Sequence, residues 1–118
     1  MGSETKTRLA FVALSVAVGG MIAYHYWPSE VVQVKYRGDV SLRPFRCTEI
    51  SESSVVKRVC YDRSNRYMLI NLNGTYYHYC GIDSDTVSNL LSADLKGRFY
   101  NVNIKQRFDC RMHPVPSY

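Results

Sequence analysis

Alternating apolar and polar positions predict three short strands in the middle of the chain. They are Val55–Tyr61, Tyr67–Leu72 and Thr75–Cys80. The dipeptide Asn73-Gly74 joins the last two strands, and it favours a tight hairpin because both residues tolerate the positive φ of a type I′ turn. Val31–Leu42 alternates only in part and breaks at Gly38-Asp39, so we expect a linker that contributes one extra strand or two short ones.

Helical spacing replaces alternation after residue 82. Asp83 or Ser84 can cap a helix that runs to about Asp94, and its buried side is expected to hold Val87, Leu90, Leu91 and Ala93. Gly97 is expected to end this helix, and Arg98–Lys105 predicts a second, shorter one. The proline-containing tail Met112–Tyr118 is expected to be extended and mobile.

The predicted fold class is therefore α+β, a three-stranded antiparallel meander followed by two short helices. Because side chains alternate along strands, each strand divides between two faces. The face expected to form the core beneath the first helix holds Val55, Val59, Tyr61, Met68, Ile70, Leu72, Tyr77 and Tyr79. The opposite face holds Val56, Arg58, Cys60, Tyr67, Leu69, Asn71, Tyr76, His78 and Cys80.

A long uncharged segment, Leu9–Trp27, precedes the predicted domain. As a helix it would be roughly 28 Å long at about 1.5 Å per residue, which is close to the thickness of a bilayer core. Lys6 and Arg8 precede it and aromatic residues crowd its far end, which favours a transmembrane anchor with a cytoplasmic N-terminus. A cleaved signal peptide is the alternative. Either interpretation places the rest of the chain outside the cytoplasmic membrane.

This organisation divides the chain into five parts. They are a cytoplasmic N-terminus (1–8), an anchor or signal peptide (9–27), a linker with possible strands (28–52), a domain (53–108) and a C-terminal tail (109–118). From Pro28 onward, thirteen Lys and Arg face nine Asp and Glu. This surplus is spread along the chain, which favours a moderately basic solvated surface over a nucleic-acid footprint.

All four cysteines follow the membrane segment, an even number that fits an oxidising compartment. If Cys60 and Cys80 both lie opposite Tyr67, on the two outer strands, their Cα atoms are roughly 10 Å apart, beyond the reach of a disulfide. We therefore expect the pair Cys47–Cys110. Reduced, buried thiols and a metal bound by His78 with Cys60 and Cys80 are the alternatives, and no CxxC spacing supports the metal.

Many of these positions, taken in order, resemble the KTSC domain, a family named after the C-terminus of some lysyl-tRNA synthetases that also occurs as a stand-alone bacterial domain. The resemblance rests on Ser53-Ser54, Val59-Cys60-Tyr61-Asp62, Met68–Leu72, Gly74, Tyr77-x-Tyr79, Ile82, Leu90-Leu91-x-Ala93, Gly97 and Tyr100-Asn101-x-x-Ile104. It implies a three-stranded sheet followed by helices, and a role in RNA binding that export would disfavour. The four cysteines depart from a typical member.

The candidate binding residues lie on the second sheet face: Arg58, Tyr67, Tyr76 and His78. Tyrosines there can stack on bases while arginine meets phosphate, but Val31–Leu42 or a partner protein can equally cover this face. Tyr77 and Tyr79 are expected in the core. No residue pattern predicts catalysis, a cofactor or a metal site. The sequence thus favours a non-catalytic binding or assembly module with an unknown protein partner, and single-stranded nucleic-acid binding is the alternative.

Overall fold

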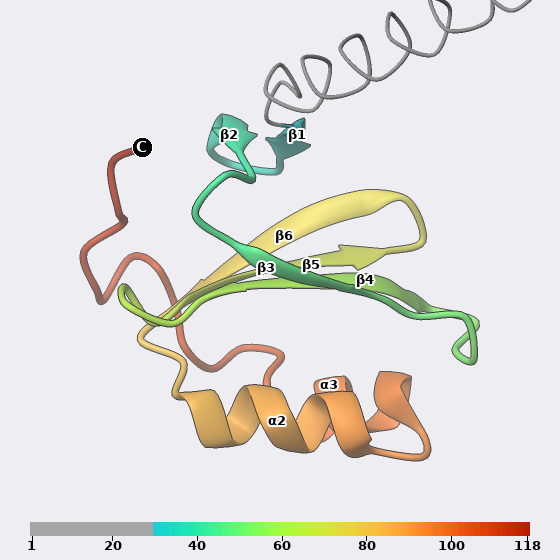
Figure 1. Cartoon of the computed structure of the whole chain (residues 1–118). Coiled ribbons are helices and arrows are strands. Elements are labelled where there is room, and N and C mark those ends of the chain that lie inside the picture. The colour runs from blue at the N-terminus through green and yellow to red at the C-terminus, as the bar shows by residue number, and fades with distance from the viewer. Residues whose placement is uncertain (1–29) are drawn as a thin grey trace, which may run out of the picture.

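The computed structural model describes residues 30–118, which form a six-stranded curled sheet with two helices on one side (Figure 1). The strands are β1 (Val31–Val34), β2 (Gly38–Ser41), β3 (Arg46–Glu49), β4 (Val56–Asp62), β5 (Tyr67–Leu72) and β6 (Thr75–Cys80). The helices are α2 (Ser84–Ser92) and α3 (Lys96–Asn103). The strand order in the sheet is β2-β1-β6-β5-β4-β3. The α+β class is confirmed.

Strands β4, β5 and β6 form the predicted antiparallel meander. Asn73 and Gly74 both have positive φ, 53° and 98°, and the Asn71 side chain accepts a hydrogen bond from the Gly74 amide. These values match the φ signs that a two-residue type I′ hairpin requires, so Leu72 pairs directly with Thr75. This turn therefore fixes the register between β5 and β6.

The register between β4 and β5 differs from the sequence expectation. Asp62 pairs with Tyr67, and Cys60 consequently lies opposite Leu69 rather than opposite Tyr67. The connecting loop is longer than expected, with Arg66 in a left-handed conformation at its end. A shift of two residues preserves side-chain parity, so most face assignments remain correct. Val56 is the exception, because an irregularity between Val56 and Arg58 turns it to the helix side.

The sheet extends beyond the meander on both edges. Val31–Leu42 supplies β1 and β2, an antiparallel hairpin whose β1 joins β6 in parallel through the pair Val34 and Tyr76. On the other edge β3 pairs with β4. The predicted extra strands in the linker are confirmed, whereas β3 was not predicted because its sequence Arg-Cys-Thr-Glu lacks an apolar alternation.

Helices α2 and α3 cover one face of the sheet (Figure 1). The Asp83 side chain accepts a hydrogen bond from the Thr86 amide and so caps α2, as predicted. Gly97 does not end this helix, because α2 ends at Ser92 and Gly97 lies in the first turn of α3. The core on this side contains Ile50, Val56, Val59, Met68, Ile70, Ile82, Val87, Leu90, Tyr100 and Ile104.

The opposite face of the sheet is covered by this chain itself. The β1–β2 hairpin lies over it (Figure 1), and a second core forms there. Its buried members are Val32, Val34, Val40, Leu42, Cys60, Tyr67, Leu69 and Cys80. Of the alternatives for this face, intramolecular packing by Val31–Leu42 is therefore confirmed.

The C-terminal tail also docks on this side, contrary to the expectation of a mobile segment. Tyr118 donates a hydrogen bond to the Asp62 carboxylate and packs against the rings of Phe45 and Tyr67. The Arg37 guanidinium donates a 2.6 Å hydrogen bond to the Pro116 carbonyl. The ring contact between Tyr118 and Tyr67 of β5 thus helps to anchor a proline-containing segment that has no secondary structure of its own.

Two disulfides join Cys47 to Cys60 and Cys80 to Cys110, so the predicted pair Cys47–Cys110 is wrong. The reason is the unpredicted strand β3, which places Cys47 directly opposite Cys60 with their Cα atoms 3.9 Å apart. The exclusion of Cys60–Cys80 holds, because β5 separates their strands. By the chain-entropy relation, the two cross-links stabilise the fold by about 3 and about 4 kcal/mol.

The predicted membrane segment, Leu9–Trp27, lies outside the described residues. Within residues 30–118, none of the helices has the length and apolar character needed to cross a bilayer.

Candidate functional site

The four residues of the predicted binding face do not form an open surface. Tyr67 is fully buried, so its ring has no face available for a base. Arg58 places its two terminal nitrogens 2.8 and 3.0 Å from the Glu30 carboxylate oxygens, and one of them also donates to the Tyr76 hydroxyl. Its Nε lies 2.5 Å from a Glu49 oxygen, without a well-directed hydrogen bond.

These pairings engage Arg58 within the chain. The hydrogen bond with Glu30 raises the pKa of the guanidinium and lowers the pKa of the carboxyl group. A phosphate would have to displace this bidentate contact before it could bind Arg58. An ion-pair cluster that joins Arg58 of β4 to Glu30, before β1, and to Glu49 of β3 thus closes the edge of the second core.

Tyr67 connects Arg37 to His78 through hydrogen bonds. Arg37 donates to the Tyr67 hydroxyl at 2.9 Å, and this hydroxyl lies 2.8 Å from His78 Nδ1. Since the hydroxyl accepts from Arg37, we infer that it donates to Nδ1, which assigns the neutral His78 tautomer with its proton on Nε2. Burial and the nearby positive charge of Arg37 both lower the pKa of His78, while burial raises the pKa of Tyr67. This arrangement favours a structural histidine.

A groove of about 640 Å³ lies at the outer edge of β6. We call it the β6 groove. One wall is the turn after β1, the floor is β6, and the other wall is the segment after α3. Its lining residues are Lys35, Tyr36, Tyr77, His78, Tyr79, Gln106, Arg107, Asp109, Cys110 and Arg111.

Positive charge dominates the β6 groove. Asp109 is its one lining carboxylate, and it pairs with Arg111 through contacts of 2.7 to 3.2 Å. Hydrogen bonds from Arg111 lower the pKa of Asp109 to about 2. The Lys35 ammonium lies 5.4 and 5.7 Å from the ring centroids of Tyr36 and Tyr77, within the range of a cation–π contact. Lys35 and Arg107 therefore leave the groove with a net positive charge.

Sequence reasoning missed most of this groove. It named His78, but it assigned Lys35 and Tyr36 to a linker and did not single out Arg107. A basic and aromatic cluster, Lys35-Tyr36-Arg37, directly precedes the break at Gly38 and could have signalled a functional turn. Tyr77 and Tyr79 were expected in the core, and both are partly buried against it while also lining the groove.

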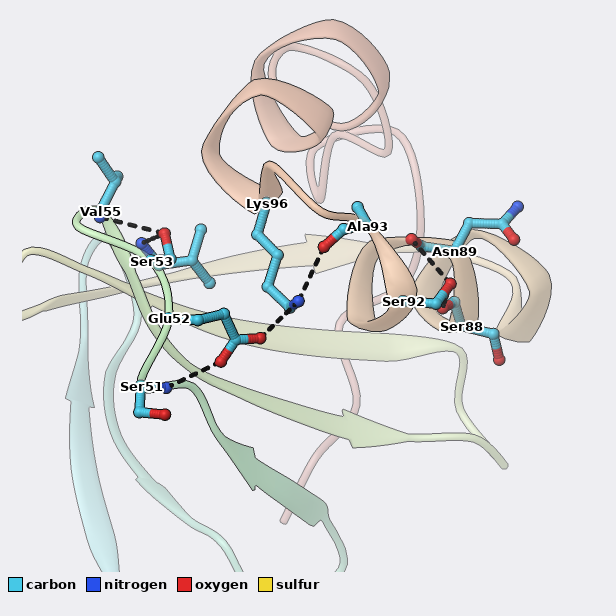
Figure 2. A network of polar contacts seen from close by, with 10 residues as sticks. Ser51, Glu52, Ser53, Val55, Ser88, Asn89, Ser92, Ala93 and Lys96 are labelled. Atoms are coloured by element: carbon cyan, nitrogen blue, oxygen red, sulfur yellow. Dashed lines mark hydrogen bonds and ion pairs between the residues drawn. The ribbon is translucent and has the colours of Figure 1, made fainter.

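A second cavity, of about 600 Å³, lies between the segment before β4 and the start of α3. Figure 2 shows the polar network beside it: the Lys96 ammonium contacts the Glu52 carboxylate at 2.7 Å and donates to the Ala93 carbonyl at 2.9 Å. Ser53 accepts hydrogen bonds from the amides of Val55 and Val56. Every polar partner here serves a turn or a helix end, so we interpret this network as structural.

All four cysteines are in disulfides, so Cys60 and Cys80 offer no thiolate to a metal beside His78. In residues 30–118 no cluster of three His, Cys, Asp or Glu side chains is placed to hold a metal ion.

A family model of the KTSC domain matches residues 52–108. A crystal structure of a KTSC domain protein from Yersinia pestis is 32% identical to this chain, with a TM-score of 0.51. This match covers 55% of this chain and 92% of the Yersinia chain. The chain belongs to the KTSC domain family. A search of the curated proteins found no match.

The KTSC match clarifies the role of the disulfides. Cys60 and Cys80 lie inside residues 52–108, whereas Cys47 and Cys110 lie on either side of this range. Each disulfide therefore links the KTSC domain to one flanking segment. The β6 groove has the same mixed origin, because its floor belongs to the KTSC domain while Lys35, Tyr36 and Arg111 come from the flanks.

Proposed function

We propose that this chain is a non-catalytic binding or assembly module, a KTSC domain that works outside the cytoplasmic membrane. The observation that carries the proposal is the pair of disulfides that fasten both flanking segments to the domain. Disulfides persist in oxidising compartments and are rare in a reducing cytoplasm. The uncharged segment Leu9–Trp27 supports the same location, as a single-pass anchor or, alternatively, as a signal peptide of a soluble periplasmic protein.

A protein partner is favoured over nucleic acid for two reasons. Arg58 and Tyr67, which would have contacted phosphate and base, are engaged within the chain. The proposed compartment also contains little RNA. The chemistry of the groove supports a binding role over catalysis, because we assign its histidine as the acceptor of a hydrogen bond from a buried tyrosine and all cysteines of residues 30–118 are in disulfides.

The location of the domain and the oxidation state of its cysteines together test the proposed compartment. The full chain carrying alkaline phosphatase at its C-terminus should be active in intact bacteria, because the phosphatase itself needs export. Alkylation of the same cells under non-reducing conditions should label none of the four cysteines. An inactive fusion whose cysteines are all labelled would place the domain in the cytoplasm and refute the proposal.

Binding is tested by crosslinking in intact membranes followed by purification of the full chain. We expect a specific protein to be captured by the wild type and not by a control that carries the same N-terminal segment fused to an unrelated domain. RNA recovered as the main crosslinked species would instead favour the nucleic-acid alternative.

A further inference from the structure

The edge of β6 is only partly paired. Its backbone groups at Tyr76, His78 and Cys80 point away from β5, because pairing in an antiparallel ladder alternates from residue to residue. Lys35 donates its amide to the Tyr76 carbonyl, and the Cys80 amide donates to the Phe108 carbonyl. Both outer bonds are 2.8 to 2.9 Å long.

Between these two bonds lies His78. The bridge to β1 occurs at the pair Val34 and Tyr76, and the segment after α3 reaches the strand only at Cys80. The amide and carbonyl of His78 consequently face the β6 groove, which this residue lines. Within residues 30–118 this amide and carbonyl have no backbone partner, and such groups at a strand edge are a template for another extended chain.

The walls of the groove favour a negatively charged occupant. Arg107 is exposed, and its side chain makes no polar contact within residues 30–118, while the opposing charge of Asp109 is neutralised by Arg111. Lys35 projects from the other wall between two tyrosine rings. The two cations thus flank the open strand edge from opposite sides.

Tyr36 provides an independent indication of binding. It occupies the left-handed region at φ 71° and its side chain is 87% exposed, on the rim of the groove. A bulky residue is strained in this conformation, and here little packing offsets the strain. Gln106, another lining residue, is also left-handed at φ 65°. An aromatic ring held at a groove rim is suited to cover an occupant.

We propose that the β6 groove binds an extended acidic peptide segment of a partner protein, and this inference rests on the proposed binding function. The peptide backbone pairs with the amide and carbonyl of His78, and its carboxylates contact Lys35 and Arg107. A peptide accounts for the open strand edge as well as for the positive charge. A nucleic acid would account for the charge alone.

The first test measures the binding of labelled peptides to the full chain by fluorescence anisotropy. The probe is a peptide of about ten residues that alternates Glu with Val, and its counterpart alternates Lys with Val. We expect saturable binding of the acidic peptide only, weakened about tenfold by Arg107→Ala. Arg98→Ala is the matched control, because it removes an exposed arginine that lines the second cavity. The Arg98→Ala variant should bind the acidic peptide with the same affinity as the wild type.

Amide hydrogen exchange supplies the structural readout. In the free protein the His78 amide should exchange faster than those of Tyr77 and Tyr79, whose amides bond to β5. The acidic peptide should slow exchange at His78, while a single-stranded oligonucleotide should not. No peptide binding, equal losses in both arginine variants, or binding without protection of His78 would each overturn the proposal. Tighter, Arg107-dependent binding of the oligonucleotide would assign the groove to nucleic acid instead.

Failure of this inference can be distinguished from failure of the proposed function. If Arg107→Ala captures the crosslinked partner as well as the wild type does, the module binds through another surface and the groove inference fails. If peptide binding holds but the phosphatase fusion shows a cytoplasmic domain, the groove inference stands and the proposed compartment is wrong.

Discussion

The two faces of the central sheet are closed by different means. On the helix side, aliphatic residues such as Leu90 and Ile70 meet in a core whose buried members all lie within the KTSC range except Ile50. On the other side, the cover comes from segments outside that range, and two disulfides, an ion-pair cluster and a tyrosine network fasten it. A small domain buries a limited apolar area, so cross-links are an effective way to add a second layer. The cover of the second face therefore lies outside the KTSC match, and disulfides fasten it to the matched domain.

The largest effect is expected from reducing both disulfides. The loops they close contribute about 3 and about 4 kcal/mol by the chain-entropy relation, a large fraction of the stability of a small domain. Urea unfolding with and without reductant measures this loss. Hydrogen exchange should rise first in β1, β2 and β3, and only later in α2. Uniform loss of protection across both faces would contradict the distinction between them.

A core truncation on the helix side should cost about half as much. Leu90 is fully buried, so Leu90→Ala is expected to lower the free energy of unfolding by about 3 kcal/mol. Leu95→Ala is the matched control, since this leucine is 66% exposed, and it should change stability by less than about 0.5 kcal/mol. Equal effects of the two substitutions in urea unfolding would show that α2 does not close this core.

Removal of the tail anchor should have a smaller effect. Tyr118→Ala deletes the ring contacts with Phe45 and Tyr67 and the hydrogen bond to Asp62, at a cost of about 1 kcal/mol. Tyr36→Ala, which removes an 87% exposed ring, should leave stability nearly unchanged. Thermal unfolding measures both variants, and an unaffected Tyr118→Ala protein would mean that the tail contributes nothing to the second layer.

The smallest expected change in stability is the one that follows from lowering the pH. Burial and Arg37 depress the pKa of His78, with Asp109 acting weakly in the other direction. His78 therefore binds a proton more readily in the unfolded chain than in the folded one. Its contribution to the free energy of unfolding is complete above about pH 6.5 and is lost as the pH falls below that value. His78→Asn keeps an acceptor near the position of Nδ1 but cannot titrate. Urea unfolding at pH 7 and pH 5.5 should show a larger loss for the wild type than for this variant.

The sequence predicts the helix-side layer well because local signals determine it. The Asn73-Gly74 turn sets one register, Asp83 marks a helix start, and parity assigns most core residues. The second layer depends on pairings that no local pattern reveals. Strand β3 has four polar or cysteine residues and exists through its pairing with β4, so the disulfide connectivity was wrong in consequence. The bulge that turns Val56 inward is equally invisible to simple alternation.

The β6 groove is the part of the molecule that the sequence predicts least. It forms where three segments distant in sequence meet, and its charged residues lie in parts of the chain without periodic signals. Of its lining residues, His78 alone was predicted as a binding residue, because strand parity places it on the second face. The arginine and tyrosine expected to bind, Arg58 and Tyr67, were correctly assigned to that face, but the sequence did not show that its cover would engage them.

Peptide mapping of the purified full chain by non-reducing mass spectrometry tests the central claim most directly. The account predicts two linked peptide pairs, one containing Cys47 with Cys60 and the other Cys80 with Cys110. Cys47 linked to Cys110, or four free thiols in protein recovered from its native compartment, would contradict a second face fastened by its own flanking segments.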